Sequence, residues 1–173
     1  VQTCALPICL ERIIKAFQII LKESSALKLS AMVLLENTSG MGSILGYNFS
    51  QLSYIMERVG YKDKIGICFD TCHAFAAGYN LAEEGDIEDT LTEMDKLIGL
   101  DRLKVIHLND SKYYLNSRKD RHTHIGEGFI GLEGFRILIN HRLVKDLPFI
   151  LETPKKSDED DRRNISIVRE LRK

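Results

Sequence analysis

No stretch of this sequence is apolar for long enough to cross a lipid bilayer, so a membrane role has no support. A charge bias is also missing: 24 Lys and Arg residues stand against 25 Asp and Glu residues, for a formal net charge of -1. Nucleic-acid-binding proteins often carry a global basic excess, so any such surface here must be local. The 173 residues, 44% of them hydrophobic, are enough for one globular domain and few for two.

Cysteine is scarce as well, and four cysteines do not make a disulfide framework in a chain of this length. Cys68 and Cys72 flank Asp70 in an otherwise apolar stretch. We interpret them as packed, reduced thiols of a cytosolic protein. Metal ligation by these thiols is the second interpretation.

Several familiar catalytic motifs are absent: there is no nucleophile elbow, no Walker loop and no recognisable serine triad. The stretch GEGFIG, Gly126 to Gly131, matches the pattern GxGxxG. It follows a charged loop rather than a strand, and no acidic residue lies at a convincing distance to hold a ribose. We therefore expect these glycines to form a tight turn into the next helix.

The chain begins at Val1 and lacks the charged and apolar regions of a signal peptide. Its first eight residues, VQTCALPI, are also what a common sequencing-library adapter encodes in one reading frame. We expect residues 1–9 to be a non-native leader left by sequence assembly, and residues 10–173 to form part of a single domain. Resequencing of the locus would test this expectation.

Helical and strand patterns alternate along the rest of the chain. Short apolar runs typical of buried strands occur at Ala31–Leu35, Ile65–Phe69, Leu103–Ile106 and Pro148–Leu151. Helices are predicted at Leu10–Glu23, Ser50–Val59, Asp86–Leu100 and Leu132–Asn140, and around Ile165–Leu171. Strands separated by helices imply parallel pairing, in an open doubly wound sheet or in part of a β/α barrel.

Each predicted strand is followed directly by a residue of a metal-ligand type, in the order Glu36, Asp70, His107 and Glu152. Because parallel strands end at one rim, these four side chains can converge. One such carboxylate usually just faces water, and His107 alone could be a hydrogen-bonded core histidine. Four in succession are harder to explain in that way. Carboxylates gathered at one rim repel each other unless cations neutralise them, and their mixture with imidazole suits zinc or manganese.

A second candidate set lies in the loops that leave two of these strands: His73, Asp120 and His122. Asp120 and His122 are two residues apart, so an extended backbone points both side chains the same way. The three could hold a metal with an open position for water or phosphate. The alternative is an ordinary charged loop whose histidines titrate in solvent, and without the strand-end residues that alternative would be preferred.

Positive charge concentrates in the same loop, at Lys112, Arg118, Lys119 and Arg121, with Tyr113 and Tyr114 between them. Cations beside a metal site suit a phosphodiester, and aromatic rings can stack on bases or sugars. Such stretches are often merely solvated, so this pattern is supporting evidence only.

Five stretches of the sequence together resemble endonuclease IV. They are ENTSGMG (Glu36–Gly42), GICFDTCHAFAAGY (Gly66–Tyr79), HLNDSK (His107–Lys112), DRHTHIGEGFIG (Asp120–Gly131) and LETP (Leu151–Pro154). The resemblance keeps order and spacing from about Leu10 to the end of the chain. It implies an α/β fold, a partial TIM (β/α)8 barrel of about four C-terminal β/α units of the xylose isomerase-like/endonuclease IV type.

The resemblance also implies an activity: a zinc-dependent AP endonuclease of base excision repair, which cleaves DNA 5′ to abasic sites and leaves a 3′-hydroxyl and a 5′-deoxyribose phosphate. Three Zn2+ ions are implied in the intact enzyme, with Mn2+ as another possibility. Glu36 would be catalytic and bridge two metals. Asp70, His107 and Glu152 would complete the second zinc, and His73, Asp120 and His122 would bind the third. Lys112 and Arg121 are candidate contacts to phosphate or DNA.

The implied partner is double-stranded DNA with abasic sites or blocked 3′ ends, bound by a monomer in the cytoplasm near the nucleoid. Two histidines from earlier strands complete the first zinc in that family, and this sequence has no counterpart for them. With about four strands where a barrel needs eight, the isolated chain is expected to be inactive and aggregation-prone. Two rivals remain, a divalent-metal sugar isomerase or epimerase on a related barrel and a noncatalytic protein that keeps the same rim.

Overall fold

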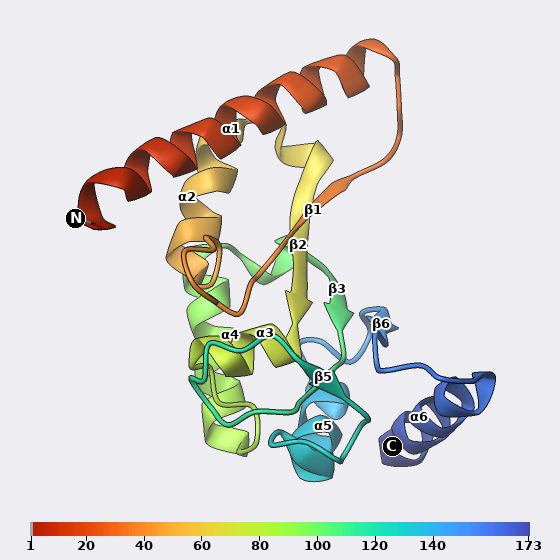
Figure 1. Cartoon of the computed structure of the whole chain (residues 1–173). Helices are drawn as coiled ribbons and strands as arrows, with labels where there is room; N and C mark the ends of the chain where they lie inside the picture. Colours follow the sequence, from red (N-terminus) through yellow and green to blue (C-terminus); the bar gives the residue numbers. More distant parts are fainter. Residues whose placement is uncertain (1) are drawn as a thin grey trace.

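Four strands of the chain pair in parallel to form one sheet, in the order β1-β2-β3-β6 (Figure 1). The computed structural model describes residues 2–173, and side chains from residue 7 onward. The strands are β1 (Val33–Glu36), β2 (Ile65–Asp70), β3 (Leu103–His107) and β6 (Phe149–Ile150). The order in the sheet follows the order in the chain, with a helix between successive strands, which confirms the expected partial barrel.

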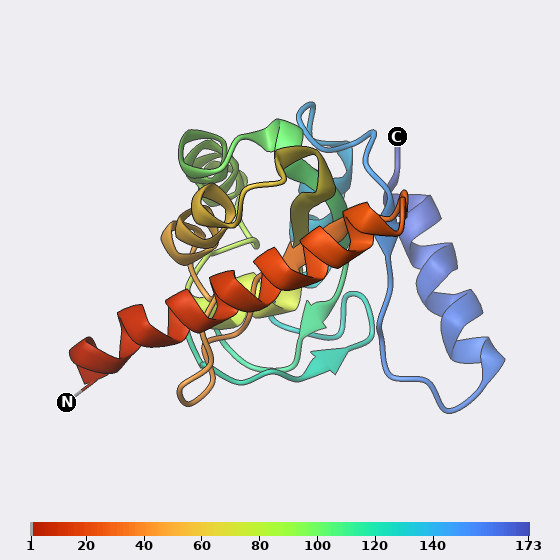
Figure 2. The same cartoon turned by 90° about the horizontal axis from the view of Figure 1, so that it is seen from above.

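The longer helices follow one another around the sheet, and each contacts the next along the chain. Figure 2 shows α1 lying across the molecule and α6 at its side. These helices are α1 (Gln2–Ala26), α2 (Phe49–Val59), α4 (Glu84–Leu97), α5 (Gly131–Asn140) and α6 (Asp158–Leu171). Short 3-10 turns, η1 (Lys62–Lys64) and η2 (Leu100–Arg102), lead into β2 and β3.

The core lies between the two inner strands, β2 and β3, and the helices. Every residue of β2 is buried, as the continuous apolar run predicted. In β1 only Leu35 is buried and in β6 neither residue is, so the same prediction is wrong for these two strands. The difference arises because β1 and β6 are the edges of the sheet, whereas β2 has a paired strand on each side.

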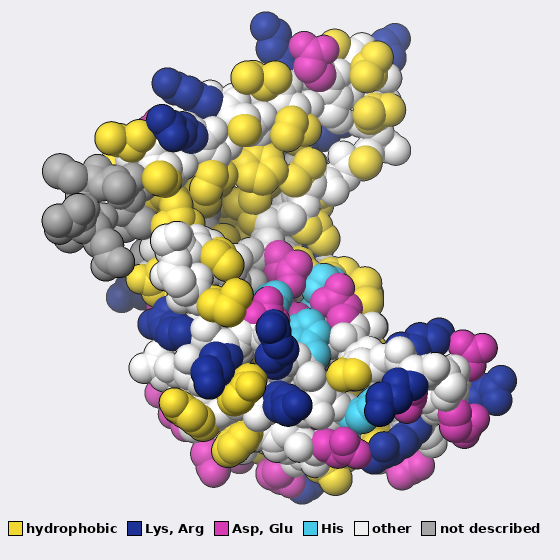
Figure 3. Space-filling model, viewed as in Figure 1, with side chains coloured by type: hydrophobic (Ala, Val, Ile, Leu, Met, Phe, Trp, Pro, Cys, Tyr) yellow, Lys and Arg dark blue, Asp and Glu magenta, His cyan; other side chains and the backbone are white. Residues whose placement is uncertain are grey.

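Helix α1 begins at Gln2, runs through the segment predicted to be a non-native leader, and ends at Ala26 rather than at Glu23. Val1 lies outside the described residues, and the origin of residues 1–9 stays a prediction. Along α1, Leu10, Ile14 and Leu21 are buried, whereas Ile20 is 51% exposed. Figure 3 shows apolar side chains gathered on this part of the surface. Within the described residues, no helix has the length and apolar character needed to span a membrane.

Side-chain caps set where two of the helices, α2 and α6, begin. Helix α2 starts after Asn48, whose side chain accepts a hydrogen bond from the backbone N–H of Gln51 at 2.9 Å, so Ser50 is not the cap. Helix α6 starts after Ser157, which forms a capping box with Asp160. The charged residues 158–163, which precede the last predicted helix, therefore lie inside α6.

Two small elements near the strand ends were not predicted. A short helix, α3 (Thr71–Ala77), follows β2 directly. Beyond β3, a two-stranded antiparallel hairpin pairs β4 (Asp110–Ser111) with β5 (His122–Thr123). Both elements lie at the end of the sheet where the strands finish (Figure 1).

Candidate metal centre

The predicted ligand side chains at the C-terminal ends of the four strands meet at one end of the sheet. The Nδ1 atom of His107 lies 3.3 Å from Oε1 of Glu36 and 3.1 Å from Oε2 of Glu152. The same nitrogen is 3.9 Å from Oδ2 of Asp70, its register partner on β2. The ligand atoms of all four residues lie within 4.8 Å of one another. The structure therefore brings the strand-end set, Glu36, Asp70, His107 and Glu152, together around one imidazole.

The three residues predicted from the loops also meet, directly beside the strand-end set. The Nε2 atoms of His73 and His122 lie 3.2 Å and 3.8 Å from the two carboxylate oxygens of Asp120. The Nε2 atom of His122 is 3.7 Å from Oδ2 of Asp70, and Nδ1 of His73 is 3.2 Å from Oε1 of Glu36. This loop set, His73, Asp120 and His122, thus forms one continuous cluster with the strand-end set.

Local structure places the two histidines of the loop set. His73 was predicted in a loop but lies in the first turn of α3, because the Asp70 side chain caps that helix by accepting from the His73 N–H at 2.8 Å. His122 lies in β5, opposite Ser111 of β4. Asp70 therefore serves two purposes: it starts the helix that carries His73, and it faces His122.

Backbone carbonyls fix the orientation of both rings. The Nδ1 atom of His122 lies 3.0 Å from the carbonyl oxygen of Glu152, and that of His73 lies 3.0 Å from the carbonyl oxygen of Asn37. Because a carbonyl only accepts, Nδ1 of each ring donates, and Nε2 is the atom that faces the cluster and offers its lone pair when the ring is neutral. In the described part of the chain, the buried Nε2 of His122 has no hydrogen-bond partner. A divalent cation would satisfy such a lone pair, so these residues fit a metal.

Burial and neighbouring charges shift the pKa values of the cluster in opposite directions. Burial raises the pKa of Asp70 above its ordinary value, against the attraction of His73. Burial also acts to raise the pKa of Glu36, but its hydrogen bond to His73 and the charge of His107 outweigh burial and lower that pKa. Burial acts to lower the pKa of His73, yet Glu36, Asp70 and Asp120 together raise it to about 9. Four carboxylates mixed with three imidazoles suit zinc or manganese.

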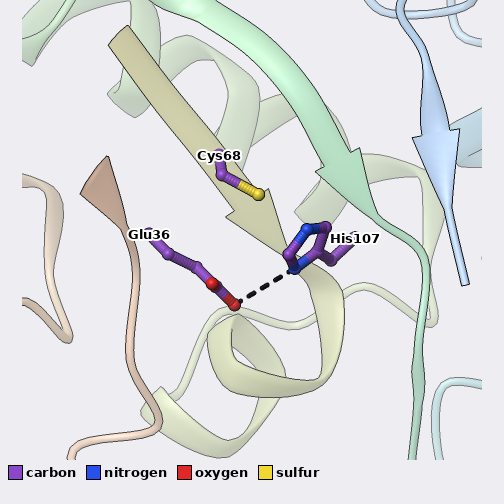
Figure 4. Close-up of side chains that lie close together, drawn as sticks. All are labelled: Glu36, Cys68 and His107. Atoms are coloured by element: carbon purple, nitrogen blue, oxygen red, sulfur yellow. Dashed lines mark hydrogen bonds and ion pairs between the residues drawn. The ribbon is translucent and has the colours of Figure 1, made fainter. Parts of the chain in front are cut away.

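A cysteine lies next to the strand-end set. Figure 4 shows Glu36 and His107 pointing toward one another, with Cys68 on β2 beside them. Burial raises the pKa of the Cys68 thiol to about 12, and that of Cys72 likewise. Both cysteines are free and buried, so the geometry agrees with packed, reduced thiols. Neutral thiols are weak ligands, which keeps metal binding by them the second interpretation.

Comparison with known proteins places this fold and cluster in a family. Residues 4–171 match the family model described as xylose isomerase-like TIM barrel. The chain belongs to this family. The xylose isomerase-like TIM barrel gathers the ends of its strands at one rim, which is where both candidate sets lie.

Among relatives within this barrel family, the chain is similar to proteins named probable endonuclease 4. It is 52% identical to that of Halothermothrix orenii over 95% of the chain and 57% of the relative, and 49% identical to that of Chloroflexus aurantiacus over 82% and 50%. The crystal structure of endonuclease IV from Thermus thermophilus matches with a TM-score of 0.77 at 35% identity, over 94% of this chain and 57% of that one. The predicted resemblance is confirmed, and the chain spans about half the length of these relatives.

Three buried polar residues around this barrel rim carry roles that the sequence did not indicate. Asn37 pairs with the backbone N–H and carbonyl of Asp70 at 2.8 Å and 3.0 Å. Asn109 contacts the side chains of Asp70 and Glu152. Asp110 accepts hydrogen bonds from several backbone N–H groups between residues 126 and 131. The only available signal was the position of each residue just after a strand-end ligand.

The two predicted DNA contacts lie on the hairpin that carries His122. Lys112 and Arg121 are exposed, and the Lys112 N–H donates to the Arg121 carbonyl at 3.0 Å. Two other cations of the same loop are held against aromatic rings: Arg118 stacks on Tyr47, and Lys119 lies over Tyr113. Figure 3 shows dark blue Lys and Arg side chains beside the histidines and carboxylates. The expected local basic surface is therefore next to the cluster.

Proposed function

We propose that this protein is a zinc-dependent AP endonuclease of the deoxyribonuclease IV type, which hydrolyses the DNA phosphodiester bond 5′ to an abasic site. The products are a 3′-hydroxyl and a 5′-deoxyribose phosphate. The observation that carries the proposal is the continuous cluster of seven ligand-type residues, in a chain 52% identical to a probable endonuclease 4. The proposal concerns the whole protein, because the relatives are about twice as long as the part of them that this chain matches.

Within the cluster, the position of Glu36 supports a bridging role. Its Oε1 atom lies 3.2 Å from Nδ1 of His73 and 3.3 Å from Nδ1 of His107, so one carboxylate faces both sets. We assign Glu36 to bridge two metals and to be the catalytic carboxylate. The second zinc is assigned to Asp70, His107 and Glu152, and the third to His73, Asp120 and His122. When bound, zinc ions activate water near neutral pH and stabilise charge on the attacking and leaving oxygens.

Other groups at this rim hold the ligand side chains in place and orient them. The carbonyls of Glu152 and Asn37 fix the rings of His122 and His73, so little reorganisation is needed when substrate arrives. Lys112 and Arg121 lie exposed on the hairpin surface, where they can contact phosphates, with duplex DNA that carries abasic sites or blocked 3′ ends as the partner. A monomeric state and a cytoplasmic, nucleoid-associated location are inferred from this role.

A sugar isomerase or epimerase is the second candidate, since the strand-end set alone converges tightly enough to hold one metal. A one-metal isomerase has no use for the loop set. The orphaned Nε2 of His122, which belongs to the loop set, therefore favours the nuclease.

The test uses the protein expressed from its complete reading frame. It is incubated with a duplex that contains one abasic site, with the intact duplex, and with a keto sugar. Incision on the 5′ side of the abasic site alone is expected. Glu36→Gln should lower kcat/KM at least about 100-fold, because a metal ligand contributes several kcal/mol to the transition state. Glu57→Gln, at an exposed glutamate of α2, is the matched control. Conversion of the sugar without incision would refute the proposal.

A further inference from the structure

Asn109 lies between β3 and β4 and is fully buried, yet it is outside both candidate ligand sets. Its Nδ2 donates to Oδ2 of Asp70 at 2.6 Å and to Oε2 of Glu152 at 3.4 Å. Its Oδ1 accepts from the backbone N–H of Glu152 at 2.8 Å. One amide therefore contacts the carboxylate of the last residue of β2, and both the backbone and the carboxylate of Glu152, which lies just beyond β6.

The backbone of Asn109 is held just as firmly. Its N–H donates to Oγ1 of Thr71 at 2.8 Å, and that hydroxyl donates to the Asn109 carbonyl at 2.7 Å. Thr71 directly follows Asp70 in the chain. Asn109 is therefore tied to the first residue of α3 through its backbone and to the last residue of β2 through its side chain, while the same side chain reaches the segment after β6.

We propose that Asn109 is a positioning residue that couples Asp70 to Glu152 across β3, so that the two carboxylates face one metal ion together. The proposal rests on the proposed metal centre and adds a residue to it that binds no metal itself. The edge strand β6 needs such a coupling. It is only two residues long and, within the described part of the chain, pairs with β3 alone, so the sheet by itself holds Glu152 weakly. The exposed fraction of the Glu152 side chain, 46%, shows how little packing restrains it.

The chemistry of the amide explains why asparagine stands at this position. An amide offers two donors and one acceptor, and the site uses both functions. An aspartate of the same size would set a third carboxylate against Asp70 and Glu152, with no hydrogen to share between them. An apolar residue would leave the buried Oδ2 of Asp70 without this donor.

The experiment measures zinc binding by competition with a chelator, using zinc alone as the probe, for the full protein and for Asn109→Asp and Asn109→Ala. Hydrogen bonds to ligating groups typically change metal affinity by about 10- to 100-fold. We expect a loss of that size in both variants, together with the loss of most of the zinc-induced rise in Tm. The expected fall is in kcat more than in KM for DNA, because the hairpin that carries Lys112 and Arg121 is untouched.

Leu91→Ala is the matched control, because Leu91 is fully buried in α4 and its loss destabilises the fold away from the rim. It should lower Tm without changing zinc affinity. Asn109→Asp keeps the size of the side chain and decides the matter if Asn109→Ala does not fold. Wild-type zinc affinity in a folded Asn109→Asp variant would overturn this inference but leave the proposed function standing. A wild-type protein that binds no zinc would overturn the proposed function and this inference with it.

Discussion

The strand-end set and the loop set meet in one cluster but are built in different ways. Parallel register holds most of the strand-end set: Asp70 is the direct partner of His107, and Glu36 is paired with Cys68 on the same strand as Asp70. The loop set depends on hydrogen bonds instead. His73 follows a helix cap formed by Asp70. The sheet therefore supplies a rigid half of the site, and polar side chains supply the other half.

This difference indicates where the site is vulnerable. A substitution in the sheet should disturb the whole fold, whereas a substitution in the polar groups behind the loop should disturb the loop set alone. Asp110 is the clearest case, because it is fully buried and contacts none of the candidate ligands directly through its carboxylate.

Asp110→Asn is expected to give the largest difference between the two sets, by weakening zinc binding at the loop set alone. The Oδ2 atom of Asp110 accepts from the N–H groups of Gly126 and Gly128, both at 2.9 Å, and Oδ1 accepts from that of Ile130 at 3.0 Å. An amide must turn its NH2 toward donors on one side, and it thereby loosens the loop that follows His122. Affinity for one zinc per protein should fall by about 10- to 100-fold, as measured by chelator competition.

Asp63→Asn is the matched control for this change, because Asp63 is exposed in η1 at the opposite end of β2. It should retain the wild-type zinc content. If Asp110→Asn released every zinc ion at once, or none, the two sets would not be supported independently.

The next effect is expected from a change of pH, which alters the stability of the protein through His73, the histidine in contact with both sets. The pKa of His73 is raised to about 9 from an ordinary value near 6.5, despite burial, by Glu36 and the neighbouring aspartates. The stabilisation is fully present below about pH 6.5 and is lost as pH rises through about 9. Metal-free protein should therefore lose about 2–3 kcal/mol of unfolding free energy over that interval, measured by urea denaturation.

Substitution of this histidine provides the comparison. Metal-free His73→Gln should show a flatter dependence over the same interval, because the glutamine does not titrate. Zinc should flatten the wild-type curve too, since a bound cation replaces the proton on the imidazole. Equal slopes for metal-free wild type and His73→Gln would contradict the pairing seen in the cluster.

The contrast between the strand-end set and the loop set also explains which parts of the site could be predicted from the sequence. The ends of the strands were predictable because short apolar runs stop at Glu36, Asp70 and His107, and parallel strands finish at one rim. The helix that carries His73 was missed, since its start depends on a side chain that also reads as a ligand. The partners of Asn109 lie 39 and 43 residues away in the chain, so only tertiary structure could reveal them.

The smallest effects are expected at the hairpin surface, where neither set is altered. Lys112→Ala and Arg121→Ala should each reduce the slope of log affinity for DNA against log salt by about 0.9, the value for one phosphate contact. Zinc content should not change. Lys104→Ala, an exposed lysine at the start of β3 and away from the rim, is the control for charge alone. An unchanged slope in both hairpin variants would remove them from the DNA surface.

Anomalous scattering at the zinc edge, from crystals of the protein grown with zinc, examines the joint metal centre most directly. Density is expected at the Nε2 atoms of His73 and His122 beside Asp120, and separately at Nδ1 of His107 among the strand-end carboxylates. A single ion at His107, with both Nε2 atoms of the loop set left without metal, would contradict a shared centre and favour the isomerase.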